Sequence, residues 1–303
     1  MTARADMFRR IVVAFDGAPS AHDALALAQR LRDPDGGALL PACVVPSRPW
    51  HVPGRPQPTR DEEESAAAML AEAQASLPRG IPVLPRTPAA SSPARGLTEL
   101  AEAEAADLIT IGSEHGAAGA RIGLTRTAGR LLHGAPCAVA VAPPGLRESD
   151  PFRHVGIALD ASAEAGAALA AGYAIAAASG SAMTIYAALD DMGRVEGADT
   201  ATRLAVQQRL DAAADAAPPG VNPRTVLLHG PAAQVIAKAS EGFIDLLVTG
   251  SRSYGPIQRA LLGSVSEELL ARATHAVLVV PRQMPASAPA AATAGGAEAL
   301  PAI

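Results

Sequence analysis

Lysine is almost absent from this chain: among its 25 basic residues only Lys238 is a lysine. A phosphate-binding loop of the G-x-x-x-x-G-K-[ST] type needs a lysine directly after its second glycine, whereas Lys238 follows Ala237. The sequence therefore excludes that whole class of nucleotide-binding enzymes. The 30 acidic residues outnumber the basic ones and give a net charge of −5. This balance argues against a nucleic-acid partner, because nucleic-acid-binding proteins carry a basic surface.

Aromatic residues and cysteines are scarce as well. Aromatics make up 3% of the chain and hydrophobic residues 49%, so the core has to consist of small aliphatic side chains. Cys43 and Cys137 are too few for a disulfide framework or a metal site, and we expect both to be small buried residues. No apolar run reaches the roughly 20 residues that span a bilayer, and residues 1–6 lack a signal-peptide core. We therefore expect a cytoplasmic protein with no membrane partner.

The chain contains one unit twice. Residues 9–16 and 153–160 read RRIVVAFD and RHVGIALD, each an apolar run that ends in aspartate, at an offset of 144. Residues 106–113 and 244–251 read ADLITIGS and IDLLVTGS, at an offset of 138. Such self-similarity indicates a repeated structural unit. The six extra residues of the first copy are best placed in the proline-rich segment 46–58.

From this repeat we predict three parts of the chain: a first domain over 1–147, a second domain over 152–282 and a disordered Ala/Pro-rich tail over 283–303. Turn residues and apolar runs predict strands near 10–15, 38–45, 80–86, 107–112 and 137–142, and again near 154–159, 182–188, 222–228, 244–249 and 275–280. Helices are predicted near 20–32, 60–77, 93–105 and 124–134, and near 162–179, 198–216, 231–242 and 264–273. Alternating strands and helices predict an α/β protein with two tandem, doubly wound, five-stranded parallel sheets (Rossmann-like, strand order 3-2-1-4-5) and helices on both faces.

In such a sheet the ligand site lies at the carboxyl ends of the strands, where the strand order reverses. Asp160 ends the first strand of the second copy and Gly250 ends its fourth strand. Gly263 and Ser264 open the following helix, whose free N–H groups favour a phosphate. The alternative interpretation is a glycine-rich turn in which Ser264 is an ordinary helix cap.

The segment 250–268, the strand end at 159–162 and the alternation of strands and helices resemble the universal stress protein family, over about residues 8–144 and 152–282. ATP-binding members of that family carry the motif G-x-x-G-x9-G-[ST] after the fourth strand. This chain departs from it once, with a serine at the second glycine. A side chain there costs roughly 1 kcal/mol if the backbone needs a positive φ. The resemblance implies that these residues contact the nucleotide: Leu159, Asp160, Gly250, Ser253, Gly263, Ser264 and Val265.

The first copy departs much further from the motif. After Gly112, His115 takes the place of the second glycine, and Thr125-Arg126 takes the place of the final pair. The alternative frame through Gly116, Gly119 and Gly129 ends in Arg130 and misplaces the helix. We therefore expect nucleotide in the second copy alone, with Arg126 filling or ion-pairing within a collapsed pocket of the first.

The resemblance implies an ATP-binding regulatory module of the stress response, and it leaves open whether Mg²⁺ accompanies ATP. One alternative is a stress protein that binds a protein partner and no nucleotide. A further alternative is a slow ATPase. Stronger enzymatic activity is not expected, because no lysine lies near the loop and no general base lies beside Ser264.

The fifth strands of the two copies, around Val139-Ala140-Val141 and Val277-Leu278-Val279, are apolar edges without a charged residue. Exposed apolar edges pair readily with other strands. Because the linker between the copies is short, we predict that these edges meet and form an intramolecular pseudo-dimer. A homodimer of chains is a further assembly that the resemblance suggests.

Overall fold

The computed structural model describes residues 8–47, 58–114, 122–146, 151–160, 165–189, 196–251 and 263–281. Ser253, the segment 48–57 and the C-terminal tail lie outside these ranges. Strands and helices alternate throughout the described chain, as the repeated pattern predicts. The strands are β1 (Arg10–Ala14), β2 (Ala38–Ala42), β3 (Val45–Pro46), β4 (Ala89–Ala90), β5 (Leu108–Gly112), β6 (Ala138–Ala142), β7 (His154–Ala158), β8 (Ala182–Leu189), β9 (Pro223–His229), β10 (Leu246–Gly250) and β11 (Ala276–Val280). The helices are α1 (Pro19–Leu31), α2 (Arg60–Ser76), α3 (Pro93–Ala103), α4 (Arg126–Leu132), α5 (Ala165–Ser179), α6 (Glu196–Asp215), α7 (Ala232–Ser240) and α8 (Ser264–Arg272).

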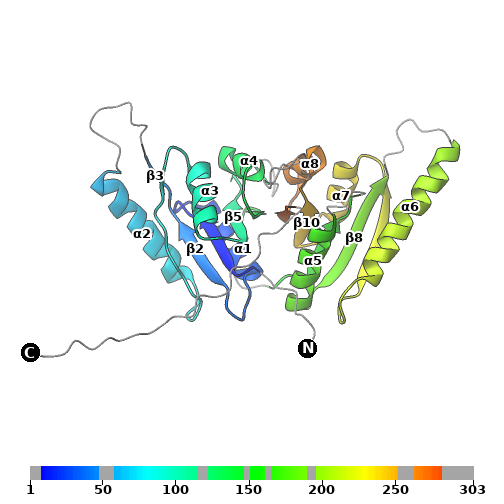
Figure 1. The fold of residues 1–303 in the computed structure, drawn as a ribbon, viewed down its shortest axis with the longest axis horizontal. Coiled ribbons are helices and arrows are strands. Elements are labelled where there is room, and N and C mark those ends of the chain that lie inside the picture. Colours follow the sequence, from blue (N-terminus) through cyan, green and yellow to red (C-terminus); the bar gives the residue numbers. More distant parts are fainter. Residues whose placement is uncertain are drawn as a thin grey trace, which may run out of the picture.

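The two halves share a single nine-stranded sheet in the order β2-β1-β5-β6-β11-β10-β7-β8-β9. Figure 1 shows the two halves side by side, with α2 at one outer end and α6 at the other. Neighbouring strands are parallel within each half, whereas β6 and β11 pair antiparallel and join the halves. The expectation of two separate sheets is therefore corrected: Val141, Ala140 and Val139 face Val277, Leu278 and Val279 in register. An edge strand has unpaired backbone N–H and C=O groups, and neither edge carries a charged side chain that would prevent pairing. The two edges therefore pair with each other.

The expected third strand of the first half, at 80–86, does not form a regular strand. It runs along the outer edge of β2 through two bridges, Leu39 with Val83 and Ala42 with Arg86. Leu84 N donates to Leu39 O at 2.8 Å, which keeps the segment in the third-strand position. The sequence PVLPRTP over 82–88 explains the irregularity, because its prolines have no N–H for a ladder. The order 3-2-1-4-5 thus holds in both halves, with this segment in place of a strand.

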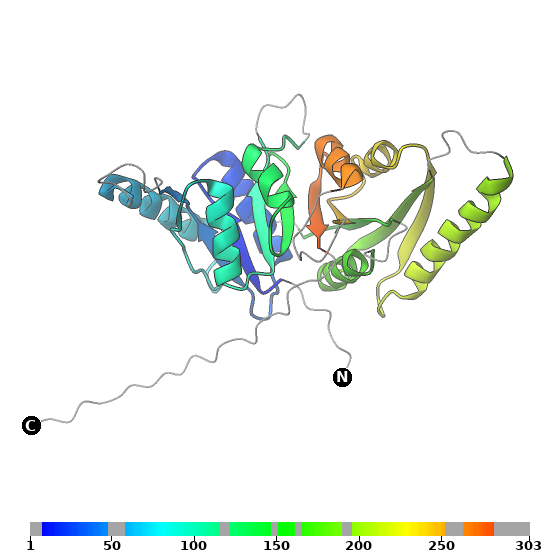
Figure 2. The same cartoon turned by 45° about the horizontal axis from the view of Figure 1, so that its top comes forward.

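Helices cover both faces of the sheet. One continuous apolar core includes buried residues of α1, α2, α5 and α6, and the other includes buried residues of α3, α4, α7 and α8. Both cores extend across the junction of the halves, where α4 and α8 lie on either side (Figure 2). The Ile122 N–H of the first half also donates to Ala273 O of the second at 2.9 Å. The junction is therefore part of the interior and not a surface contact.

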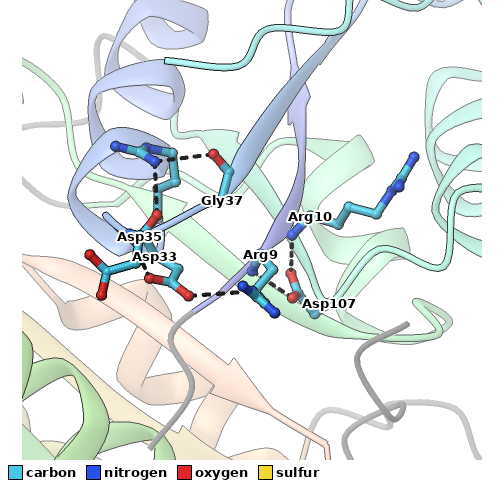
Figure 3. A network of polar contacts seen from close by, with 7 residues as sticks. Arg9, Arg10, Asp33, Asp35, Gly37 and Asp107 are labelled. Carbon is cyan, nitrogen blue, oxygen red and sulfur yellow. Dashed lines mark hydrogen bonds and ion pairs between the residues drawn. The ribbon is translucent and has the colours of Figure 1, made fainter. Parts of the chain in front are cut away.

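An aspartate before the fourth strand ties that strand to the first one in each half. Asp107 accepts hydrogen bonds from the backbone N–H groups of Arg9 and Arg10 at 2.7 and 3.1 Å (Figure 3). Asp245 repeats this arrangement with residues 153–154 at 2.7 and 2.9 Å. Burial raises the pKa of Asp107 to about 6, although its hydrogen bonds oppose the shift.

Local signals in the sequence match the ends of the helices. Thr59 and Glu62 form the reciprocal capping box that begins α2, whose first turn is acidic. Ser92 caps α3 through the Arg95 N–H. Both cysteines are free and buried, as expected. Among the helices of the described ranges, none is both long and apolar enough to cross a membrane.

Candidate functional site

A cavity of about 210 Å³ opens in the second half. It lies at the carboxyl ends of β7, β8 and β10, which is the side of the sheet where ligands bind in open α/β proteins. The start of α8 closes one wall, while α6 and α7 supply others. The residues that line it are Ala158, Leu159, Asp160, Ala187, Ala188, Val206, Arg209, Ala232, Ile236, Thr249, Gly250, Gly263, Val265 and Ser266.

The structure brings most of the predicted site residues together at this cavity. Five of the seven line it: Leu159, Asp160, Gly250, Gly263 and Val265. The sixth, Ser264, is the exposed first residue of α8 and is not among the lining residues. Ser253, the seventh, lies outside the described residues, so its departure from the family motif stays untested.

The helix that faces the cavity begins without a side-chain cap. Gly263 is the N-cap of α8 in an extended conformation, and its lack of a side chain leaves the first N–H groups without a side-chain acceptor. One turn further on, the buried Ser266 hydroxyl donates to Gly250 O at 3.2 Å and lies 3.3 Å from the Thr249 hydroxyl. These contacts fix the start of the helix against the end of β10. The arrangement leaves a positive helix end directed at the strand ends.

The charged groups at this cavity are an aspartate and an arginine. Asp160 and Arg209 are both exposed, and Arg209 is the one cationic side chain among the described lining residues. Small side chains at Ala187 and Ala188, at the end of β8, keep the floor open. The sequence analysis missed these two alanines, together with Val206 and Arg209 of α6. The strand-end rule could have indicated the alanines, whereas nothing in the linear pattern indicates where α6 packs.

The first half has a matching cavity of about 230 Å³. It lies at the carboxyl ends of β1, β2 and β5, beside the start of α4. The residues that line it are Ala14, Phe15, Asp16, Ser20, Ala21, Ala42, Cys43, Val44, Pro93, Leu97, Ile111, Gly112, Thr125 and Thr127. Our expectation of a collapsed pocket filled by Arg126 is therefore wrong. Arg126 is exposed at the first position of α4, and the lining at the strand ends includes small residues that leave space.

The start of α4 differs from the start of α8 in one decisive respect. Thr125 occupies the position of Gly263, and its side-chain oxygen accepts a hydrogen bond from the Ala128 N–H at 3.0 Å. One of the free donors of the helix is thereby used internally. Gly129 lies inside α4 and not at its start, so the alternative frame of the motif does not describe this helix.

Gly112 shows how closely the chain approaches itself at the first cavity. A Cβ atom at this position would lie 1.9 Å from the Ser20 carbonyl oxygen. No side chain other than hydrogen fits between β5 and the start of α1. The first glycine of the motif is therefore required by packing in this half, whatever binds there.

These features define a class: a tandem, doubly wound α/β protein with a cavity at the strand ends of each half. The family model of the universal stress proteins matches residues 7–143 and again 151–281. The chain belongs to the universal stress protein family. No curated protein matches it significantly.

Two solved structures that cover most of this chain agree with this fold. A universal stress protein from Archaeoglobus fulgidus DSM 4304 is 18% identical, with a TM-score of 0.62 over 90% of this chain and 98% of that one. A protein of unknown function from Pseudomonas aeruginosa PAO1 is 19% identical, with a TM-score of 0.65 over 93% of this chain and 95% of that one. A universal stress protein solved in complex with cAMP is 25% identical, with a TM-score of 0.36 over 43% of this chain and 97% of that one.

Proposed function

We propose that the second-half cavity binds ATP or a related adenine nucleotide, one molecule per chain, and that occupancy changes the conformation or partner choice of a cytoplasmic stress-response module. The observation that carries this proposal is the uncapped start of α8 at Gly263, which faces the strand ends that hold Gly250 and Asp160. Helix N-termini of this kind favour phosphate groups.

The remaining residues of the cavity fit the other parts of a nucleotide. Asp160 supplies a hydrogen-bond acceptor for the adenine or the ribose, next to Leu159. Ala187 and Ala188 leave room for a flat ring, and Arg209 would attract the phosphates. We propose that Gly250, Gly263, Ser264, Val265 and the loop residue Ser253 surround the ribose and the phosphates, with or without Mg²⁺.

Calorimetric titration of the intact chain with ATP tests the proposal. We expect a stoichiometry of one, and we expect Gly263→Val to abolish binding because its branched side chain would meet the phosphates. The matched control is Thr125→Val at the equivalent position of the first half, which should leave ATP binding unchanged. Titration of two molecules per chain, or normal binding by Gly263→Val, would contradict the proposal.

A partner-binding protein without nucleotide is the second candidate. The side-chain cap at the start of α4 favours this candidate, because the free N–H groups that would bind a phosphate are partly used internally in the first half. A wild-type chain that shows no binding of ATP would favour this candidate. Release of phosphate from bound ATP at a measurable rate would instead support slow hydrolysis.

We further propose that two chains associate as a homodimer, and sedimentation at several protein concentrations would test this assembly.

A further inference from the structure

The first-half cavity is as large as the second one, but its lining has a different chemical character. We propose that it is a second ligand site, which takes a small, mainly apolar molecule with an N–H or O–H donor and no anionic group. This site acts independently of the nucleotide proposed for the second half. Three differences between equivalent positions of the two cavities support the inference.

The first difference is the helix start. The Thr125 hydroxyl accepts the Ala128 N–H at 3.0 Å, and α4 is a short helix of 7 residues. The equivalent Gly263 has no side-chain cap. The element that favours a phosphate in the second cavity is therefore satisfied internally in the first.

The second difference is charge. Among the described residues that line the first cavity none is a lysine or an arginine, and Asp16 is the one carboxylate. Asp16 accepts one hydrogen bond from the Ala18 N–H at 3.1 Å and has further lone pairs for a ligand donor. Desolvation, followed by the negative charge of Asp16, raises the pKa of the Cys43 thiol, which stays neutral. An anionic ligand would meet repulsion from Asp16, and the described part of the lining offers no cation to offset it.

The third difference lies at three equivalent positions in the walls of the two cavities. Phe15 replaces Leu159, Val44 replaces Ala188 and Ile111 replaces Thr249 at equivalent positions. Each replacement either enlarges an apolar side chain or removes a hydroxyl, while Ser20, Thr125 and Thr127 contribute hydroxyl-bearing side chains elsewhere in the first lining. Ligand sites for apolar molecules combine such walls with a small number of polar groups that fix the orientation, and here Asp16 is such a group.

Indole is a suitable probe because it is apolar, uncharged and carries one N–H donor. Its anionic relative, indole-3-acetate, tests the charge requirement. We expect calorimetry to show indole binding to the intact chain at roughly 0.1–1 mM. Indole-3-acetate should bind roughly fivefold more weakly because its carboxylate approaches Asp16.

Cys43 provides a local reporter. It lines the cavity with 8% of its surface exposed, while Cys137, the chain's other cysteine, is fully buried. Indole should slow alkylation of Cys43 by N-ethylmaleimide, as located by peptide mass, and ATP should leave it unchanged. Absence of protection by indole, or protection of Cys43 by ATP, would overturn the proposal.

Two matched variants assign each ligand to its cavity. Val44→Phe should fill the first cavity and remove indole protection while ATP binding persists. Ala188→Phe, at the equivalent position of the second half, should remove ATP binding while indole protection persists. Retention of indole protection in Val44→Phe would overturn the assignment. Failure of ATP to bind the wild-type chain would contradict the proposed function alone.

Asp16→Asn keeps the proposal testable if Val44→Phe does not fold. Asp16 is exposed, and asparagine retains an acceptor for the Ala18 N–H, so the fold should tolerate the change. We expect indole-3-acetate to bind this variant within about twofold of indole. An unchanged preference for indole would show that Asp16 does not read the charge of the ligand, and would overturn the charge argument.

Discussion

The side-chain cap at the start of α4 stabilises the fold by an amount that can be measured at a single residue, Thr125. Thr125→Ala removes the oxygen that accepts the Ala128 N–H, and loss of such a cap lowers stability by about 1 kcal/mol. Urea denaturation should show this decrease with an unchanged m-value. Ser264→Ala is the matched variant in the second half. Its side chain is exposed and is not the cap of α8, so its effect should stay within about 0.5 kcal/mol.

Asp107 should make stability depend on pH in an unusual direction. Its pKa rises from 3.8 to about 6 on folding, so the folded state binds more protons than the unfolded state between these values. Stability therefore falls as the pH rises through this window, by about 3 kcal/mol if this group acts alone.

Chemical denaturation from pH 4 to pH 7 tests this prediction. The difference in stability between wild type and Asp107→Asn should change across that range, because asparagine does not titrate. Asp245→Ala removes the equivalent side-chain acceptor and reports the cost of losing the backbone contacts themselves. A constant difference between wild type and Asp107→Asn would contradict the prediction.

Among the elements, the irregular segment 82–86 depends on a side-chain contact more than a regular strand would. Glu104 forms ion pairs with Arg86 of this segment, at 2.6 Å, and with Arg10 of β1. The hydrogen bond from Arg86 is the largest cause that lowers the pKa of Glu104, and Arg10 adds to it. The contact therefore stabilises the fold above the ordinary pKa of glutamate and is lost as the pH falls through the lowered value.

Glu104→Gln should cost about 1 kcal/mol, since both arginines are partly exposed and solvent screens the pairs. Hydrogen exchange should accelerate at the Leu84 and Arg86 amides, which bond to β2. The matched variant Glu99→Gln breaks the exposed pair with Arg95 and should leave these amides unchanged. Equal exchange in both variants would show that Glu104 does not hold the segment.

Most elements could be predicted from the sequence because their signals are local. Apolar runs and the turn residues between them place most helices to within a few residues of their observed ends. The segment 82–86 could not be predicted correctly, because its apolar residues indicate a strand while its prolines remove ladder donors. The outcome depends on the edge position next to β2, which only the assembled sheet defines.

At the scale of the whole molecule, the same limit applies to the candidate site. Asp160 and Gly263 follow from a linear motif and from the rule that ligands bind at strand ends. Arg209 comes from a helix that reaches the cavity through tertiary packing, which no linear pattern indicates. The first cavity could not be predicted from the motif, because a departure from a ligand motif does not by itself remove the pocket at the strand ends. Thr125 caps α4 in place of the glycine, and the cavity beside it is nevertheless open.

The junction between the halves is the feature on which the whole assembly depends. Val279 of β11 pairs with Val139 of β6 and is 1% exposed. Val279→Lys would bury a charge without a partner, which typically costs 3–5 kcal/mol. We expect a large decrease in melting temperature and a larger radius of gyration in solution scattering, because the halves would separate along this seam, where both apolar cores cross from one half to the other.

Leu204→Lys provides the control for this last prediction. Leu204 lies on α6 with 57% of its surface exposed, so the same charge added there should change stability by less than about 0.5 kcal/mol. ATP titration of Val279→Lys adds a second readout, because the second cavity lies at the ends of β7, β8 and β10 and does not include β11. Binding should persist at temperatures where that half stays folded. If Val279→Lys melts and scatters like wild type, the antiparallel pairing of β6 with β11 does not hold the two halves together in solution.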